Sequence, residues 1–191
     1  MMRTALTVLL FGLTLVATAA ANPIAVDLFV DFYPPNGVMS VYPAPYTTFN
    51  AYVVANLSYL TGDGVYSVSF DVEVPDVMPP VSDFVPADPT YTVLGIVGDG
   101  ITVIVEDCIT SFPATLGYVQ LFYMGTPGQL QILSHPYLGH VFTTCGDPGS
   151  EEDYCYVQGG GIGMEPPEPL ILCSHNPVND VAWGAIKAMY R

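Results

Sequence analysis

The alternation of apolar and polar residues over positions 66–74 constrains the fold of this chain more than any other feature. Its apolar members are Tyr66, Val68, Phe70, Val72 and Val74, and its polar members are Ser67, Ser69, Asp71 and Glu73. A period of two places the two sets on opposite faces of a β-strand, one buried and one in contact with solvent. Positions 26–33 and 49–59 alternate in the same way. Half-buried strands of this kind are typical of antiparallel sheets, so the sequence predicts an all-β protein.

Turn signals separate the strand-like runs from one another. A Gly-Asp-Gly sequence stands at positions 62–64 and again at 98–100, each time between two such runs. Asp and Gly both tolerate positive φ, so this pattern predicts two hairpins. Prolines cluster at 34–35 and throughout 75–89, where they exclude central strands. The long proline-rich connection favours a crossing from one sheet to another, and hence a sandwich.

The N-terminus carries the three parts of a secretory signal peptide at residues 1–21. Arg3 supplies the basic start, and positions 6–16 form the apolar core. Ala19 and Ala21 are the small side chains that a signal peptidase requires. A retained membrane anchor is the alternative, but the apolar run is shorter than the ~20 residues of a span. We expect cleavage, no membrane span in the mature chain, and a secreted, periplasmic or cell-surface location.

The mature chain is expected to form one sandwich domain at 22–145, followed by an irregular, disulfide-linked region at 146–191. That second region shows no strand periodicity and contains two Gly- and Pro-rich stretches. It is predicted to end in a short helix, because Asn179 can cap residues 180–190. A helix this short is marginal in isolation. It would either dock on the sandwich or act as a sorting segment.

The charge balance limits the kinds of partner. The chain has 18 acidic residues and only three Lys or Arg, for a net charge of −15. Nucleic acid binding requires Lys and Arg to displace counterions, so it is excluded as a function. Anionic lipid is repelled for the same reason. The balance is compatible with divalent cations, cationic proteins or neutral glycans, but we favour the simpler interpretation, mere solubility outside the cell.

Four cysteines predict two disulfides in an exported protein. Of the three possible pairings we favour Cys108–Cys145 with Cys155–Cys173. Cys108 and Cys145 each end a strand-like run and could lie at one end of neighbouring strands. The second pair would hold the irregular C-terminal region. Zinc is the competing use, but the chain contains no C-x-x-C pair.

One acidic loop is a candidate calcium site. Asp147, Glu151 and Asp153 could supply the oxygen ligands that calcium accepts in flexible loops. The spacing does not match an EF-hand, and a solvated acidic loop is the simpler interpretation. Calcium is the only cofactor that the sequence suggests.

Aromatic residues on the polar side of two strands form a candidate ligand platform. Phe29, Tyr33 and Tyr52 alternate there with apolar residues and have Asp or Asn neighbours. Exposed rings of this kind could stack on the apolar faces of pyranose sugars. We favour the other interpretation, that the second sheet or the C-terminal helix covers them, since scattered exposed rings need no functional explanation.

No constellation of residues indicates catalysis. Ser134 and His135 are adjacent, as are Ser174 and His175, but neighbours in a chain do not generally face each other. No G-x-S-x-G motif is present, and nothing selects a carboxylate pair from the 18 acids. The sequence therefore predicts a non-enzymatic binding or structural protein with an unknown extracellular protein or glycan as partner. A glycan-binding module, assisted by calcium, is the first alternative, and a small secreted hydrolase is the second.

Two segments resemble known proteins. Residues 65–75, VYSVSFDVEVP, resemble a strand of cohesin-like and other bacterial immunoglobulin-like sandwiches. This resemblance implies an antiparallel immunoglobulin-like β-sandwich and, for a cohesin, a dockerin partner. Residues 181–191 resemble the last residues of uncharacterised secreted bacterial proteins, which implies export.

Overall fold

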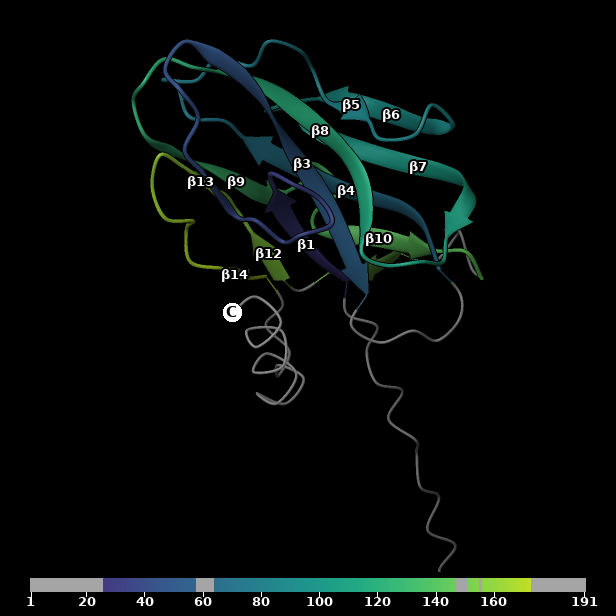
Figure 1. Cartoon of the computed structure of the whole chain (residues 1–191). Helices are drawn as coiled ribbons and strands as arrows, with labels where there is room; N and C mark the ends of the chain where they lie inside the picture. Colours follow the sequence, from purple (N-terminus) through teal and green to yellow (C-terminus); the bar gives the residue numbers. More distant parts are fainter. Residues whose placement is uncertain (1–25, 58–63, 147–150, 155, 173–191) are drawn as a thin grey trace, which may run out of the picture.

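The computed structural model describes residues 26–57, 64–146, 151–154 and 156–172, and within them it is an all-β sandwich (Figure 1). The strands are β1 (Val26–Asp31), β2 (Ser40–Val41), β3 (Thr47–Leu57), β4 (Val65–Glu73), β5 (Val85–Pro86), β6 (Tyr91–Ile96), β7 (Gly100–Ile109), β8 (Ala114–Tyr123), β9 (Gly128–Ser134), β10 (Val141–Thr144), β11 (Glu151–Asp153), β12 (Tyr156–Gln158), β13 (Gly160–Ile162) and β14 (Leu170–Ile171). The predicted all-β class and two-sheet sandwich are confirmed. The predicted leader at 1–21 and the predicted helix at 180–190 lie outside the described residues.

The first sheet has six strands in the order β14-β12-β1-β3-β8-β5. Its longest pairing joins β3 to β8 in antiparallel register, from Thr47 opposite Tyr123 to Ala55 opposite Ala114. β1 pairs with β3 in antiparallel and with β12 in parallel orientation. A second parallel pairing joins β13 to β2. The sandwich is therefore not wholly antiparallel. Local alternation could not reveal these pairs, because parallel neighbours are joined by long connections.

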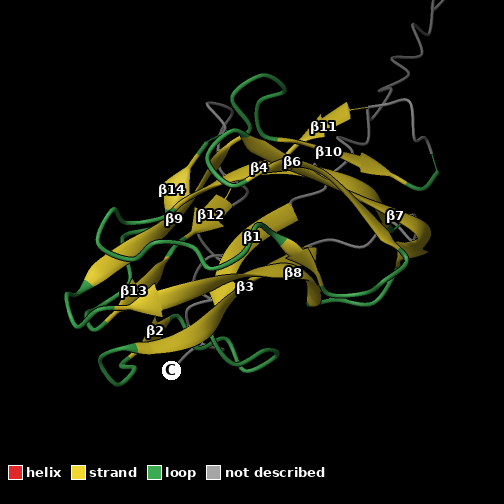
Figure 2. Cartoon of the chain, turned by 90° about the horizontal axis from the view of Figure 1, so that it is seen from above, coloured by secondary structure: helices red, strands yellow, loops and turns green. Residues whose placement is uncertain are grey.

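The second sheet has eight strands and lies against the first (Figure 2). Its path is β11-β10-β4-β9-β13-β2, with β7 on the other side of β4 and β6 beyond β7. The Gly-Asp-Gly turn at 98–100 joins β6 to β7 as the predicted hairpin. The hairpin predicted at 62–64 is wrong. β3 and β4 belong to different sheets, so this connection crosses the sandwich.

The core lies between the two sheets and follows the alternation of the strands. Val68, Phe70 and Val72 of β4 are fully buried, and Val30 and Val53 face them from the first sheet. Phe70 also makes an edge contact with Phe84, at 5.6 Å between ring centroids. Each such side chain contributes about 1.5–3 kcal/mol by leaving water. The apolar residues of the alternation at 66–74 thus lie on the inner face of the second sheet.

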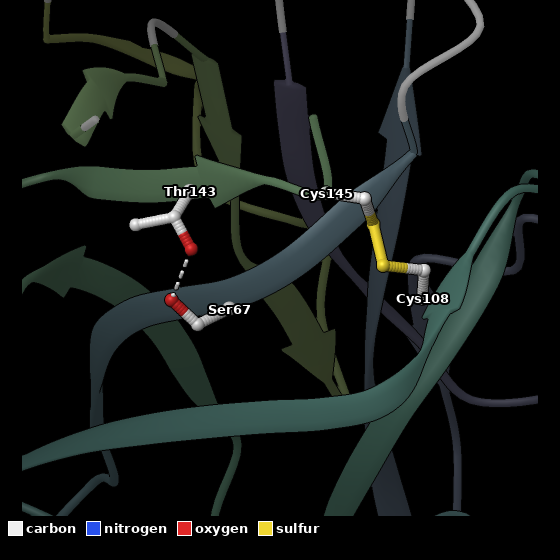
Figure 3. Close-up of a disulfide and its surroundings, with 4 residues drawn as sticks. All are labelled: Ser67, Cys108, Thr143 and Cys145. Carbon is white, nitrogen blue, oxygen red and sulfur yellow. Dashed lines mark hydrogen bonds between the residues drawn. A yellow bond between two sulfur atoms is a disulfide. The ribbon is translucent and has the colours of Figure 1, made fainter. Parts of the chain in front are cut away.

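One disulfide joins the two strands that flank the start of β4. Cys108 near the end of β7 is bonded to Cys145 just after β10, with 6.1 Å between their Cα atoms (Figure 3). Val65, the first residue of β4, pairs with both strands, so the bond crosses over the start of β4. The predicted Cys108–Cys145 pairing is confirmed. Closing a loop of this length is worth about 4 kcal/mol in the chain-entropy account. Cys155 and Cys173 lie outside the described residues.

A buried tyrosine completes the hydrogen bonding of β4. This strand pairs with β10 up to Val68 and with β9 from Phe70 onward, which leaves Ser69 between the two. The Tyr154 hydroxyl donates to the Ser69 backbone carbonyl at 2.9 Å. Burial, followed by the negative charge of Asp71, raises the pKa of Tyr154. The phenol therefore keeps its proton and remains a donor at neutral pH.

The sheets continue past Cys145 into the region that was expected to be irregular. β12 joins β1, and β13 joins β9 and β2, so described residues after 150 lie inside both sheets. Strands of two or three residues are too short to show a period. Glycine permits the close approach: a Cβ on Gly160 would lie 2.7 Å from a methyl of Val30. Among the described residues, no helix has the length and apolar character needed to cross a membrane.

Candidate functional site

A hollow open to solvent lies on the outer face of the first sheet. Its volume is about 570 Å³, and its lining residues are Phe32, Tyr33, Pro34, Pro35, Asn36, Tyr52 and Thr115. Tyr52 belongs to β3 and points outward, since its neighbours Ala51 and Val53 are in the core. Thr115 belongs to the adjacent strand β8. The floor of the hollow is thus rigid sheet, and its rim is the loop that follows β1.

A buried carboxylate fixes the conformation of this rim. Asp31, at the end of β1, has no exposed surface. Its Oδ1 accepts hydrogen bonds from the backbone N–H groups of Tyr33 at 2.8 Å and Val38 at 2.9 Å. Its Oδ2 accepts another from Gly37 at 2.8 Å. Gly37 has a φ of 67°, which glycine adopts without strain. The rim is therefore ordered before any ligand arrives.

The floor beside the hollow carries a row of aromatic and amide groups. Tyr52 lies opposite Tyr118, with ring centroids 5.4 Å apart. Asn50 lies opposite Gln120 one step along the same face. The Gln120 side-chain amide donates to Asn50 Oδ1 at 3.3 Å, and the Asn50 amide donates to the Tyr52 hydroxyl at 3.3 Å. These bonds connect the amides to the phenol and orient its ring at the edge of the hollow.

Two of the three residues predicted as a ligand platform meet here, and the third does not. Tyr33 is 58% exposed, and it lines the hollow together with Tyr52. Placing Phe29 on this platform was wrong, because its side chain is only 6% exposed. β1 lies between β12 and β3, and its alternate residues Asp27 and Asp31 are buried with Phe29. Alternation along a strand cannot reveal that both of its faces are covered.

Sequence reasoning missed the amides and the second ring of the row. Tyr118 and Gln120 fall at alternate positions of one strand, which places them on a single face. That signal was present in the sequence. What was absent was the register that sets them opposite Tyr52 and Asn50, because register is a property of two strands.

The predicted calcium ligands are only partly described. Asp147 lies outside the described residues, and Glu151 begins β11, with its backbone paired to Thr143. The Asp153 side chain is 64% exposed, and its Oδ2 lies 3.7 Å from Nε2 of His140. Among the residues that the structure describes, no three His, Cys, Asp or Glu side chains gather as a metal site would require. Calcium binding stays a prediction.

The serine–histidine neighbours do not form a described catalytic pair. Nδ1 of His135 accepts hydrogen bonds from the backbone N–H groups of Tyr137 and Leu138, both at 3.2 Å. The same ring lies against Gly100, where a Cβ would be 2.6 Å from its Nε2. His135 therefore stabilises a turn and packs on the β6–β7 hairpin. Ser174 and His175 lie outside the described residues.

Comparisons with known proteins give a structural likeness only. No protein-family model matches the chain. No curated protein matches it by sequence either. Among solved structures the chain is similar to cohesin modules, each at low sequence identity.

Three of these structures come from different organisms. A chain of a type I cohesin–dockerin complex from Clostridium thermocellum is 12% identical, with a TM-score of 0.49 over 72% of this chain and 97% of that chain. A non-cellulosomal cohesin from the archaeon Archaeoglobus fulgidus is 13% identical, with a TM-score of 0.46 over 72% and 89%. A type II cohesin domain from Acetivibrio cellulolyticus is 10% identical, with a TM-score of 0.47 over 74% and 96%. The likeness is thus a weak, cohesin-like β-sandwich resemblance of the fold.

Proposed function

We propose that this chain is a non-enzymatic binding module, secreted, periplasmic or cell-surface, which takes an extracellular protein or glycan at the hollow. The observation that carries the proposal is that Tyr33 and Tyr52 both line a hollow whose rim is fixed by Asp31. The predicted leader at 1–21 supports export of the module.

The chemistry of the hollow favours recognition. Tyrosine offers a large apolar ring with a polar end and is enriched at protein interfaces. Pro34 and Pro35 make the rim stiff, and the Asp31 hydrogen bonds hold it in place. A surface ordered in advance loses less conformational entropy when a partner binds. The volume of about 570 Å³ lies in the range of ligand pockets and suits one protruding side chain or loop of a protein partner.

A glycan is the second candidate, and the row of rings and amides favours it. Asn50 and Gln120 offer hydrogen-bonding groups beside the rings of Tyr52 and Tyr118. Aromatic faces next to amides suit the apolar and hydroxyl faces of a sugar. For this glycan-binding candidate we also propose that calcium, held by Asp147, Glu151 and Asp153, assists binding. Glycan binding could occur without it.

Site-specific photo-crosslinking tests where the partner binds. A photo-reactive residue replaces Asn36, which is exposed on the rim, and in a control protein it replaces Tyr137, which is 84% exposed on another turn. The native extracellular fraction is irradiated with each protein. We expect one partner to be captured from position 36 and none from position 137. A double variant, Tyr33→Ala with Tyr52→Ala, should lose this capture while keeping its folded circular dichroism spectrum.

A glycan array separates the two candidate ligands. Binding that disappears in the double variant assigns a glycan, and a further loss with chelator assigns calcium assistance. If an identified partner or glycan binds the wild type and the double variant equally, the hollow is not the site. Silence in both experiments contradicts the proposed function, as does turnover of a hydrolase substrate that a single point mutation abolishes.

A further inference from the structure

The edge strand β6 leaves backbone hydrogen-bonding groups unused by the rest of the described chain. β6 pairs with β7 over its whole length, and no other described strand pairs with it (Figure 1). In an antiparallel pair, alternate residues direct their N–H and C=O groups away from the partner strand. Such an edge is a template for one more strand.

The composition of β6 leaves this edge unprotected. Proteins usually block a sheet edge with charge, proline or a very short strand. β6 has six residues, YTVLGI, with neither charge nor proline among them. Leu94 and Ile96 are 53% and 46% exposed, whereas Val93 packs against the core. Gly95, with a φ of 88°, ends the regular part of the strand. The Tyr91 N–H already donates to the Asp88 carbonyl at 3.0 Å, so the usable edge is centred on Val93.

A carboxylate stands at each end of this uncharged strand. Asp88 precedes β6, and its Oδ1 accepts hydrogen bonds from the Thr90 backbone N–H at 2.9 Å and hydroxyl at 2.7 Å. Asp99 follows β6 in the turn to β7 and is exposed. The described residues contain no Lys or Arg, so neither carboxylate has such a partner among them. An added strand would therefore lie between two negative charges.

We propose that β6 accepts an extended peptide segment of a partner as an additional strand, with apolar side chains beside Leu94 and a basic residue at each end. Backbone hydrogen bonds would supply affinity, and Asp88 and Asp99 would select the charge of the flanks. This surface belongs to the second sheet, so the inference does not rest on the hollow of the first.

A second copy of this chain is the wrong occupant on electrostatic grounds. Antiparallel pairing of β6 with itself must set residues of the same orientation opposite each other, for example Val93 opposite Val93. Asp88 of one copy would then lie one residue from the position opposite Asp99 of the other, at both ends of the pair. Like charges on neighbouring strands this close repel each other. A foreign segment with basic ends meets no such cost.

The test uses the full chain and a synthetic peptide. The probe is a capped peptide of about eight residues, enough to span a strand, with Lys at each end and alternating Val and Thr between. Fluorescence anisotropy measures affinity, and hydrogen–deuterium exchange measures protection of the β6 amides. We expect saturable binding with slower exchange of the Val93 amide, which lies on the free edge. Asp88→Asn combined with Asp99→Asn should weaken binding about tenfold, and Asp76→Asn, at an exposed site in another loop, should not.

Two further arms separate strand addition from simple attraction of a cationic peptide. Methylation of alternate backbone nitrogens along one edge of the peptide should abolish binding in one of the two possible frames, because the donors toward β6 are removed. Equal binding of both methylated peptides, or binding without protection of β6, overturns the proposal. So does an absence of saturable binding.

Protection of β6 that rises with protein concentration alone would make a second copy the occupant, which also overturns the proposal. The Tyr33→Ala, Tyr52→Ala variant should bind the peptide normally, so failure here and failure of the hollow are distinguishable.

Discussion

Two buried aspartates, Asp31 of the first sheet and Asp71 of the second, each organise a turn of backbone by different means. Their side chains are 0% and 8% exposed. Asp31 uses both oxygens, on N–H groups within seven residues of itself. Asp71 uses Oδ1 alone, which accepts from its neighbour Val72 at 2.8 Å, from Gly98 at 3.0 Å and from Gly100 at 3.3 Å.

The difference is one of range. Asp31 closes a local loop and so shapes the rim of the hollow, whereas Asp71 reaches across the sheet to the turn of the β6–β7 hairpin. Both residues stand at positions where alternation indicates a solvent-facing charge. In each case the carboxylate instead accepts buried backbone donors, which would otherwise be costly to leave unsatisfied. A carboxylate on the polar side of a strand is thus as much a structural acceptor as a surface charge.

Removing the carboxylate of Asp31 should have the largest effect. Asp31→Ala leaves the N–H groups of Tyr33, Gly37 and Val38 without their acceptor in a buried place. We expect the free energy of unfolding to fall by about 3–5 kcal/mol, measured by urea denaturation. Asp71→Ala should cost less, because one of its hydrogen bonds is long at 3.3 Å. An equal or greater loss for Asp71→Ala would contradict this ranking.

Two glycines of the Asp71-bound turn separate backbone strain from crowding. Gly98 and Gly100 have φ values of 86° and 97°, but only Gly100 faces the His135 ring, which a Cβ would approach to 2.6 Å. Gly98→Ala should cost about 1 kcal/mol through strain alone. Gly100→Ala should cost about 2–3 kcal/mol, since the imidazole must also move. Thermal unfolding of both variants measures the difference, and equal melting temperatures would show that His135 does not crowd the turn.

The parts of the fold that were predictable are those that one strand encodes by itself. Alternation at 66–74 identified β4 and its buried face, and the Gly-Asp-Gly turn at 98–100 identified the β6–β7 hairpin. The same turn signal at 62–64 was misleading, because a tripeptide does not say which sheet the next strand joins. The strands after Cys145 were missed for a related reason. Their partners, such as β1 for β12, lie far away in the sequence.

The candidate site was predictable to a similar degree. Tyr33 and Tyr52 were identified from facing alone, and both line the hollow. Phe29 was misplaced because facing does not report what covers a face. Asp31, which fixes the rim, looked like one of many solvated acids. Its role depends on a loop that folds back on it, and no short pattern in the sequence predicts that loop.

Amide substitutions test how many carboxylate oxygens each of the two aspartates needs. Asp71→Asn can keep a carbonyl oxygen at the single position that accepts all three N–H groups. Asp31→Asn cannot, because its amide nitrogen must face a backbone donor at either Oδ position. We expect Asp31→Asn to lose about 1–2 kcal/mol more than Asp71→Asn in urea denaturation. Equal losses would mean that the negative charge determines the stability at both positions. The number of carboxylate oxygens that accept hydrogen bonds would then have no effect at either position.

A small effect is also expected at Tyr154, whose pKa the charge of Asp71 helps to raise. Tyr154→Phe leaves the Ser69 carbonyl without its 2.9 Å donor, at a cost of about 1–2 kcal/mol at pH 8. Burial first, and then Asp71, raise the pKa of Tyr154 above its ordinary value of 10.0. The folded state therefore holds this proton when the unfolded chain has released it, so Tyr154 contributes fully below pH 10 and its contribution falls as pH rises further.

Urea denaturation at pH 8 and pH 11 measures this pH dependence. The loss of stability between the two pH values should be smaller in Tyr154→Phe than in the wild type. It should be unchanged in Tyr137→Phe, whose ring is 84% exposed. If Tyr154→Phe keeps the whole alkaline loss, the phenol at 154 is not held protonated by its surroundings. Asp71 would then act only through its hydrogen bonds to the turn between β6 and β7, just as Asp31 acts only through its hydrogen bonds to its own loop.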